Sequence, residues 1–427
     1  MTTSFLPESP PAAEVRTAAA GHRTTVLIGT DTYPPDVNGA AYFTARLARG
    51  LVRRGARVHV VCASPDGHPH VVERDGVVEH RLRSMSSLVH DSVRLALPLG
   101  VRGHLDRLLE RLRPDAVHIQ NHFLIGRMLA AAARTHGVPV VATNHFMPEN
   151  LFDYVHVPGP LRPHAARMAW RDLGAVLSRV DHVTTPTPAA ARLLWEQGFT
   201  RPVEPVSCGI DLARFRPVEG GDARRRRIRA RLGVPDRTTV VFVGRLDEEK
   251  RADELIRAVA RTAADVQLVL AGHGAYRRRL EDLAEAEGVA DRVVFLGFVA
   301  HEDLPDVYRA ADVFAIAGIA ELQSIATLEA MASGLPVVAA DAMALPHLVE
   351  EGANGFLYPP GSPEELAARV DEVVADEARR RAMGAHSREM ASAHRLEDSL
   401  ARFERIYREA AAEGVALPVE GFALSRR

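Results

Sequence analysis

One segment of the sequence reads Val313-Phe-Ala-Ile-Ala-Gly-Ile-Ala-Glu321-Leu-Gln-Ser-Ile-Ala-Thr-Leu-Glu329-Ala-Met-Ala-Ser-Gly-Leu-Pro-Val-Val-Ala-Ala340, and much of the chain repeats its pattern. Apolar runs at 313–317 and 335–340 predict two buried strands. A helix is expected between them, beginning near Glu321 and ending before Gly334 and Pro336, which stop helices. Because open α/β sheets bind ligands at the carboxyl ends of their strands, we expect Glu321 at a ligand site.

Glu321 and Glu329 lie eight positions apart, which corresponds to about 12 Å on a helix rising 1.5 Å per residue. A hexose and the ribose of a nucleotide sugar are separated by a comparable distance. The first helical turn adds unpaired backbone N–H groups that attract an anion. These groups belong to Leu322, Gln323, Ser324 and Ile325. Two carboxylates for hydroxyls beside a phosphate cradle suggest a nucleotide-sugar site, although two solvated glutamates on a surface helix also fit the spacing.

The bulk composition is typical of a soluble globular protein with more than one domain. The chain has 427 residues, 47% of them hydrophobic and 25% charged, with a formal net charge of -2. A single core seldom serves a chain of this length, and nothing in the charge balance requires nucleic acid. Cys62 and Cys208 are too few for a disulfide framework or a thiolate zinc site. We therefore expect a cytoplasmic protein without a membrane span.

Short apolar runs alternate with longer helical patterns, and the alternation occurs twice along the chain. We expect first-sheet strands at 26–29, 58–62, 117–120, 138–143 and 182–185, and second-sheet strands at 240–244, 267–272, 293–296, 313–317 and 337–340. Helices are expected at 40–54, 101–112, 127–135 and 188–196. The pattern predicts two parallel α/β sheets whose carboxyl ends face each other across a cleft.

Turn residues mark the boundaries between the expected domains. Residues 203–217 are rich in proline and form the expected linker. We expect a disordered tail at 1–22, domains at 23–205 and 206–392, and a helix at 393–427 that crosses back to the first domain. Its apolar face comprises Leu396, Leu400, Phe403, Ile406 and Tyr407.

Two further strand-to-helix loops carry candidate phosphate ligands. In the first domain, Asn38-Gly39 lets backbone amides approach a ligand where the helix begins, although the segment also fits an ordinary turn. In the second domain, Arg245 and Lys250 follow a strand closely enough to aim at a diphosphate. The alternative for these cations is a set of surface salt bridges with Asp247, Glu248 and Glu249.

Three of these segments together resemble family four of the retaining glycosyltransferases. They are Gly244-Arg-Leu-Asp-Glu-Glu-Lys250, Cys208-Gly-Ile-Asp-Leu-Ala-Arg-Phe-Arg-Pro217, and Glu321 followed after seven residues by Glu329-Ala-Met-Ala-Ser-Gly-Leu-Pro-Val-Val338. The resemblance extends from about residue 26 to residue 374 and implies the B-type fold of two Rossmann-like domains. Within the family it is similar to bacterial mannosyl- and glucosyltransferases that act on glycolipid or inositol-type acceptors.

The resemblance implies a role for each matching residue. Gly39 would contact the donor phosphate through its backbone, while Arg245 and Lys250 would neutralise the leaving diphosphate. Glu321 would bind hydroxyls of the transferred sugar, Glu329 the ribose, and His145 would face the sugar from the acceptor domain. The base contacts would come from Gly297, Phe298 and Val299. Ser324 stands where the family commonly has glycine, so the donor remains open between UDP- and GDP-linked sugars.

These roles predict a retaining, metal-independent hexosyltransferase that needs no cofactor beyond its nucleotide-sugar substrate. The sequence contains neither an Asp-x-Asp motif nor a histidine cluster suited to a metal. A hydrolase is disfavoured because carboxyl groups two helical turns apart exceed the roughly 5 to 10 Å over which acid and base flank one glycosidic bond. A non-hydrolysing nucleotide-sugar epimerase and a non-catalytic partner subunit of the same fold are the alternatives.

We expect the acceptor to be a glycolipid or an inositol-type compound, with a small soluble natural product or polyol as the alternative. Residues 81–113 mix basic and apolar side chains, which fits peripheral contact with the cytoplasmic face of the plasma membrane and fits a solvated helix pair equally well. These side chains are Arg83, Arg94, Arg102, Arg107 and Arg111 with Leu82, Leu88, Leu95, Leu97 and Leu99. A lipid acceptor predicts vesicle binding that weakens with salt.

Overall fold

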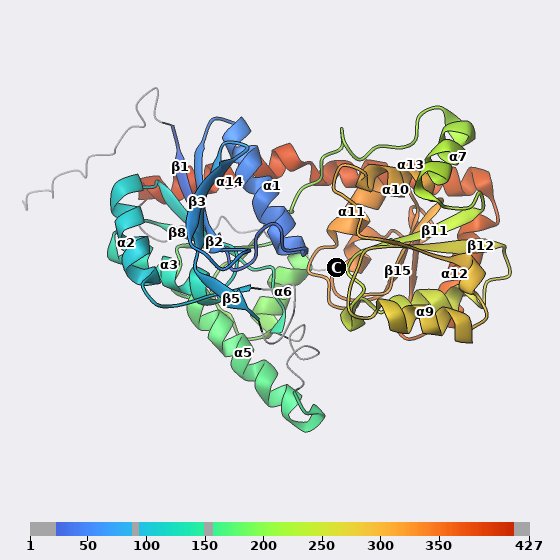
Figure 1. Cartoon of the computed structure of the whole chain (residues 1–427), viewed down its shortest axis with the longest axis horizontal. Helices are drawn as coiled ribbons and strands as arrows, with labels where there is room; N and C mark the ends of the chain where they lie inside the picture. Colours follow the sequence, from blue (N-terminus) through green and yellow to red (C-terminus); the bar gives the residue numbers. More distant parts are fainter. Residues whose placement is uncertain (1–22, 88–93, 149–156, 414–427) are drawn as a thin grey trace, which may run out of the picture.

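The computed structural model describes residues 23–87, 94–148 and 157–413, which form two α/β domains lying side by side (Figure 1). The tail expected at residues 1–22 lies outside the described residues, as do Leu88 and the last residues of the terminal segment. Among the described helices, none combines the length and apolar character that crossing a membrane requires.

The first domain contains an eight-stranded sheet in the order β10-β9-β8-β7-β1-β2-β4-β3. Its strands are β1 (Thr25–Gly29), β2 (Arg57–Ala63), β3 (His70–Arg74), β4 (Val77–Leu82), β7 (Ala116–Ile119), β8 (Val140–Thr143), β9 (His182–Thr185) and β10 (Glu204–Pro205). All neighbours are parallel except β3 and β4. Its helices are α1 (Gly39–Arg53), α2 (Val101–Leu112), α3 (Leu124–Thr135), α5 (Arg162–Leu177) and α6 (Pro188–Glu196), and a small hairpin joins β5 (Ser84–Ser86) to β6 (Arg94–Ala96).

The second domain has an all-parallel sheet in the order β13-β12-β11-β14-β15-β16. Its strands are β11 (Thr238–Val243), β12 (Val266–Ala271), β13 (Val293–Gly297), β14 (Val313–Ile316), β15 (Val337–Ala340) and β16 (Gly355–Tyr358). Its helices are α7 (Gly221–Leu232), α8 (Ala252–Val259), α9 (Arg277–Ala286), α10 (Leu304–Ala310), α11 (Ile325–Ala332), α12 (Pro363–Val374) and α13 (Glu377–Ala391). The strand order reverses between β11 and β14, and it reverses between β1 and β7 in the first sheet. Ligands bind beside such reversal points.

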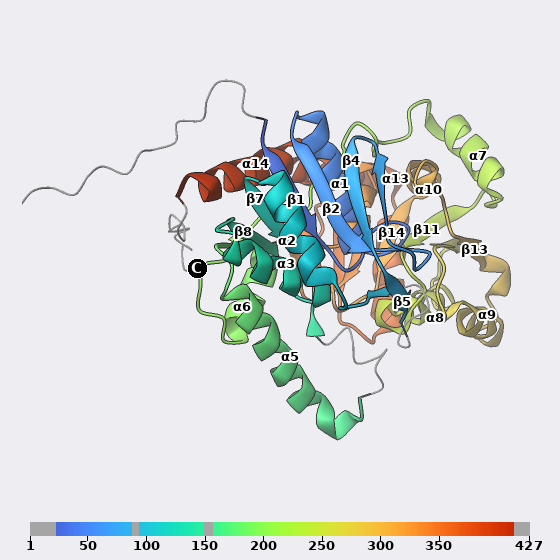
Figure 2. The ribbon, with the colours of Figure 1, turned by 60° about the vertical axis from the view of Figure 1, so that its left-hand side comes forward.

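Two crossing segments connect the domains and lie against each other. The backbone N–H of Ile210 donates to the His394 carbonyl at 2.7 Å, and that of Leu396 donates to the Ile210 carbonyl at 3.0 Å. After this crossing, α14 (Leu396–Glu413) packs on α1, β7 and β8 of the first domain, as the turned view in Figure 2 also shows. All five apolar side chains of its expected face are buried in that domain's core.

The sequence interpretation was wrong about where α11 begins. The helix was expected from Glu321, but it begins at Ile325 because the Ser324 side chain caps it by accepting from the Thr327 N–H at 3.2 Å. Glu321 therefore belongs to the loop after β14, and only Glu329 lies on the helix. The argument that placed both glutamates 12 Å apart on one helix axis does not hold. The sequence analysis also missed β16 and the β3–β4 edge.

Candidate active site at the domain junction

The amino ends of α1 and α11 approach each other from opposite domains. A Cβ placed on Gly39, the first residue of α1, would lie 4.0 Å from Ile325 Cδ1, the first residue of α11. Asn38 caps α1 by accepting from the Ala41 N–H at 2.9 Å. Because the amino end of a helix carries a partial positive charge and unpaired N–H groups, two such ends create a favourable place for an anion.

The candidate cations of the second domain lie in one cluster with three carboxylates. Arg245 pairs with Asp247 at 2.7 Å and with Glu249 at 2.5 Å. Lys250, at the end of the short turn η3 (Glu248–Lys250), lies 2.8 Å from Glu321 Oε1 and 3.5 Å from Glu249. The salt-bridge alternative is therefore correct for Arg245 with two of its neighbours, whereas Lys250 contacts a carboxylate 71 residues further along the chain.

The sheet order explains this long-range pair. Lys250 follows β11 and Glu321 follows β14, and these strands are neighbours at the reversal point. Burial disfavours the Lys250 ammonium, but the carboxylates of Glu321 and Glu249 outweigh burial and raise the pKa of Lys250. The ammonium is thus charged at neutral pH and held at the sheet's carboxyl edge.

Lys250 also carries a signal that the sequence analysis overlooked. Of the 53 lysines and arginines in the chain, it is the only lysine. A compact ammonium with three donors differs from a planar guanidinium in geometry and hydration. The single lysine of the chain is therefore the residue that contacts Glu321.

Glu329 lies on the second turn of α11 and is almost fully buried. Its Oε2 accepts a hydrogen bond from the Tyr308 hydroxyl at 2.8 Å. Burial raises the pKa of Glu329 to about 7, although Tyr308 and the nearby charges of Arg46 and Arg214 act in the opposite direction. This carboxyl group consequently changes its charge close to neutral pH.

Two of the residues expected at the donor site have side chains in the domain junction. Leu322 packs against Met147 and Ala190 of the first domain, and its carbonyl accepts from the Thr187 hydroxyl at 2.8 Å. Gln323 Oε1 accepts from the backbone N–H of Cys208 in the linker at 2.7 Å. The side chains of Leu322 and Gln323 are thus engaged in contacts within the protein. The packing of Leu322 on Met147 also brings the loop after β14 against the segment that follows β8.

The loop after β13 presents an exposed aromatic side chain. Phe298 is 59% exposed, and its ring meets that of His273 edge-on at 5.8 Å. Gly297 has a φ of +69°, a left-handed conformation that glycine adopts without strain. Val299 instead packs against the core of the second domain. The two rings offer a surface on which a planar base can stack.

His145 follows β8 and faces the same junction from the first domain. Its ring lies 4.7 Å from that of Phe43 on α1, and its Nε2 lies 3.1 Å from Gln120 Oε1. Burial lowers the pKa of His145 to about 4, so the ring is neutral at physiological pH.

The sequence analysis missed two further junction residues on α1. Tyr42 and Arg46 lie four positions apart and therefore share one face of the helix. The Tyr42 ring lies 5.8 Å from that of His301 in the second domain, and Arg46 donates to the Cys208 carbonyl at 3.0 Å. The spacing of four residues was the feature of the sequence that could have indicated their shared face.

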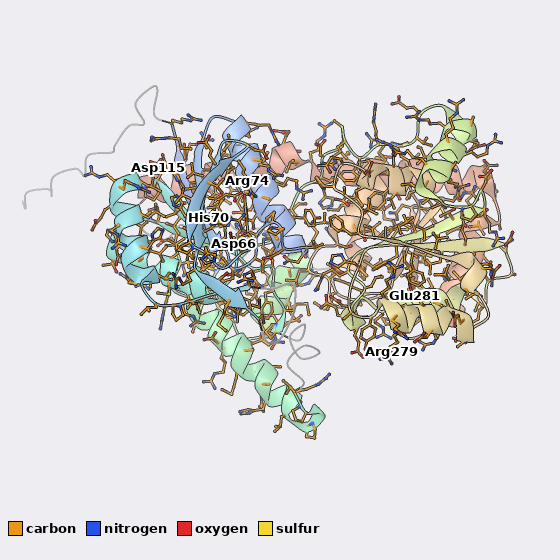
Figure 3. The ribbon with its side chains drawn as sticks, viewed as in Figure 1. Asp66, His70, Arg74, Asp115, Arg279 and Glu281 are labelled. Atoms are coloured by element: carbon orange, nitrogen blue, oxygen red, sulfur yellow. The ribbon has the colours of Figure 1, made fainter. Side chains whose placement is uncertain are left out.

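The opposite ends of the strands carry structural contacts instead. Asp115, labelled in Figure 3, lies at the far end of the first domain and accepts from the Thr25 N–H at 2.7 Å, at the amino ends of β1 and β7. Among the described residues, no group of three histidine, cysteine, aspartate or glutamate side chains is arranged to hold a metal ion. The charged and aromatic groups that can meet a ligand thus concentrate at the carboxyl edges of the two sheets.

Two facing Rossmann-like domains with such a cluster between them define a glycosyltransferase of the B-type fold. Residues 37–214 match the family described as Glycosyltransferase Family 4, and residues 224–390 match Glycosyl transferases group 1. The chain is 33% identical over 360 residues to a GDP-mannose-dependent alpha-mannosyltransferase of Mycobacterium tuberculosis, covering 82% of this chain and 87% of that protein. The chain belongs to glycosyltransferase family 4.

A further relative agrees with this assignment, and solved structures share the fold. A D-inositol 3-phosphate glycosyltransferase of Salinispora tropica is 34% identical over 331 residues, covering 71% of this chain and 67% of that protein. The sucrose-phosphate synthase of Thermosynechococcus elongatus superposes with a TM-score of 0.75 at 22% identity, covering 91% of this chain and 99% of that one. The structure of Anabaena HepE with UDP-glucose gives 0.74 at 20% identity, covering 91% and 100%. The solved structures confirm the predicted fold.

Proposed function

We propose that this protein transfers a hexose of the mannose or glucose type from a nucleoside-diphosphate sugar to an acceptor hydroxyl, with retention of configuration and without a metal ion or other cofactor. The observation that carries the proposal is the contact between Lys250 and Glu321 beside the facing amino ends of α1 and α11. In this contact, Lys250 is a cation that can bind the diphosphate, and Glu321 is a carboxylate that can bind the sugar. Both lie where the amino ends of the two helices favour an anion.

The proposed chemistry requires charge stabilisation more than a nucleophile. As the bond between the anomeric carbon and the phosphate oxygen breaks, the sugar gains oxocarbenium character and the diphosphate gains negative charge. Arg245, Lys250 and the two helix ends can stabilise that charge, and such preorganised groups are typically worth about 3 kcal/mol each in the transition state. The acceptor oxygen then bonds to the same face of the anomeric carbon, and its proton passes to the departing phosphate.

The identities of relatives support the substrate classes. The mycobacterial relative is named for GDP-mannose, the Salinispora relative for inositol 3-phosphate, and a Streptococcus pneumoniae relative at 28% identity is an alpha-monoglucosyldiacylglycerol synthase. We therefore propose a glycolipid or inositol-type acceptor. The aromatic pair of His273 and Phe298 would hold the donor base, and Glu329 the ribose.

A donor panel tests the proposal directly. Purified protein is incubated with UDP- and GDP-linked hexoses, with lipid acceptors in vesicles or soluble inositol phosphates and polyols, and nucleotide release is followed. We expect release to depend on the acceptor, to persist in EDTA and to yield a retained anomer by NMR. Donor consumption without an acceptor would identify an epimerase, and no turnover with any donor would contradict the proposal.

The titration of Glu329 predicts how donor binding depends on pH. The ionised carboxylate accepts hydrogen bonds from both ribose hydroxyls, so donor affinity should rise by about tenfold between pH 6 and pH 8, across its pKa of about 7. Stability of the free protein should change in the opposite sense. Folding raises the pKa of Glu329 from 4.5 to about 7, so the protonated carboxyl group stabilises the folded protein. This contribution to the free energy of unfolding is complete below pH 4.5 and is lost as the pH rises through 7.

Calorimetric titration with UDP and GDP at pH 6, 7 and 8 measures the affinity, and thermal unfolding measures the stability. Glu329→Gln should bind weakly with no pH dependence in this window. A variant that keeps the wild-type dependence would show that another group is responsible.

We also propose that the first domain contacts an anionic membrane surface through α5, which projects from the domain in Figures 1 and 2. Residues 157–171 contain no aspartate or glutamate, and Leu161 and Met168 are 58% and 60% exposed. Towards the carboxyl end of α5, Arg127, Arg134 and Arg179 line a hollow of about 450 Å³ beside α3, where Arg127 also pairs with Asp172 at 2.5 Å. Basic and apolar side chains together favour binding to anionic lipid.

Cosedimentation with anionic and with zwitterionic vesicles tests this contact. Reversing Arg162 and Arg167 to glutamate should weaken binding to anionic vesicles by at least about tenfold, since each cation near such a surface contributes roughly 1 kcal/mol. Reversal of Arg278 and Arg279, on α9 of the second domain, is the matched control. Arg279 is labelled in Figure 3. Equal binding by both double variants, or no preference for anionic lipid, would place the contact elsewhere.

A further inference from the structure

Gln120 and His145 lie just beyond the carboxyl ends of neighbouring strands. Gln120 follows β7 and His145 follows β8, and the two strands are parallel, with Ile119 opposite Ala142. Both residues therefore lie at the carboxyl edge of the first sheet, where the junction is. Gln120 is fully buried, and its Oε1 lies 3.1 Å from His145 Nε2.

The orientation of the Gln120 amide is fixed from its other side by His118. The amide nitrogen lies 3.2 Å from both ring nitrogens of His118. An approach in the ring plane at these distances would collide with Cε1, so the amide group lies over the face of the ring. An N–H group can only donate, and the face of a neutral imidazole is electron-rich, which turns the amide oxygen towards His145.

His118 is itself held in place by groups from two elements, α14 and β8. Its Nδ1 lies 2.7 Å from the Tyr407 hydroxyl of α14, and its Nε2 lies 2.7 Å from the Thr143 hydroxyl at the end of β8. Phe403, one turn before Tyr407, packs its ring at 5.3 Å. Burial, with smaller contributions from His145 and His182, lowers the pKa of His118 to about 3, so the ring stays neutral.

These contacts determine which nitrogen of His145 carries the proton. An amide oxygen only accepts, so Nε2 of His145 must be the protonated nitrogen, and in a neutral ring Nδ1 then has a free lone pair. Within residues 23–87, 94–148 and 157–413, no group forms a hydrogen bond with that Nδ1. The Phe43 ring limits how far the imidazole can tilt.

We propose that Gln120 is a positioning residue that holds His145 in the tautomer with the hydrogen on Nε2, so that Nδ1 accepts a hydrogen bond from a hydroxyl of the bound sugar. This inference rests on the proposed function, together with the role implied by the family resemblance, in which His145 faces the sugar. It extends that function by naming the hydrogen-bond polarity of the site: a substrate hydroxyl donates to His145 and does not accept from it. A sugar lacking a hydroxyl there would lose the contact.

The variant Gln120→Glu gives a readout that a merely structural role would not. A carboxylate against Nε2 should raise the pKa of His145 towards or above neutrality, protonate Nδ1 and remove the acceptor. At each pH, the kcat/KM of the variant is divided by that of the wild type. We expect this ratio to be about tenfold lower at pH 6 than at pH 8. The other titratable groups near the ring are His118, which also contacts residue 120 and whose pKa the new carboxylate should raise from about 3, and beyond it His182 with its partner Glu204.

Nitrogen NMR of histidine-labelled protein reads the tautomer without any activity. His145 is assigned by its loss in His145→Gln, and we expect the Nε2–H tautomer in the wild type and a doubly protonated ring at pH 6 in Gln120→Glu. If that variant does not fold, Tyr407→Phe frees His118 and should give a mixture of His145 tautomers.

Each outcome decides the inference separately from the proposed function. An Nδ1–H tautomer in the wild type, or a wild-type pH profile in Gln120→Glu, would overturn the role of Gln120 even if the protein is an active transferase. The expected tautomer in a protein that transfers no sugar would support the positioning role of Gln120 and would refute the proposed function.

Discussion

Glu321→Ala is expected to lower kcat by about 100-fold or more while leaving the affinity for a free nucleoside diphosphate unchanged or tighter. The carboxylate contacts Lys250 at 2.8 Å and is proposed to bind hydroxyls of the transferred sugar. Its removal takes away a group needed in the transition state, and losing one such preorganised contact commonly costs about 10²–10³ in rate. It also releases Lys250 towards the diphosphate.

Steady-state kinetics with a sugar donor and calorimetry with the nucleotide alone separate these two effects. Glu285→Ala, an exposed glutamate on α9, is a matched control that should behave as wild type. Glu329→Ala should mainly raise the donor Kd, because its proposed contact is with the ribose. Equal activity in Glu321→Ala, Glu329→Ala and wild type would remove the site assignment.

Lys250→Met is expected to reduce kcat/KM by about 10²–10³. The substitution removes the ammonium group that is proposed to contact the diphosphate, while it nearly keeps the volume of the side chain. Lys250→Arg should retain only part of the wild-type rate. A guanidinium group is larger and planar, so it cannot form the same short contact with Glu321 in the space that the ammonium occupies. The double variant Glu321→Ala/Lys250→Met should lose less than the sum of the two single losses, because the two residues act as a pair.

The single lysine of the chain also allows a chemical test. Amine-directed reagents can modify only Lys250 and the amino terminus, so mass spectrometry follows this one site without interference. We expect UDP or GDP to protect Lys250 while the amino terminus continues to react. Unchanged labelling at saturating concentrations of both nucleotides would separate Lys250 from the diphosphate.

The sequence was sufficient for the architecture because secondary structure depends on local patterns. The alternation of apolar strands and helices predicted both parallel sheets, and the five apolar side chains of α14 predicted which face is buried. Candidate residues could be placed at strand ends because carboxyl ends in a parallel sheet share an edge. The start of α11 was wrong by four residues, because the Ser324 cap competed with the expected start at Glu321.

The chain by itself determined the two sheets, the crossing back of its last helix and the residue types at the edges. Only the tertiary structure decided their partners: Lys250 with Glu321, Gln323 with the linker, and Gln120 between His118 and His145. It also decided that Glu329 would be buried and titrate near neutrality. The physical reason is that a periodic pattern specifies which way a side chain points, whereas its partner and its desolvation depend on strands that become neighbours only when the sheet is assembled.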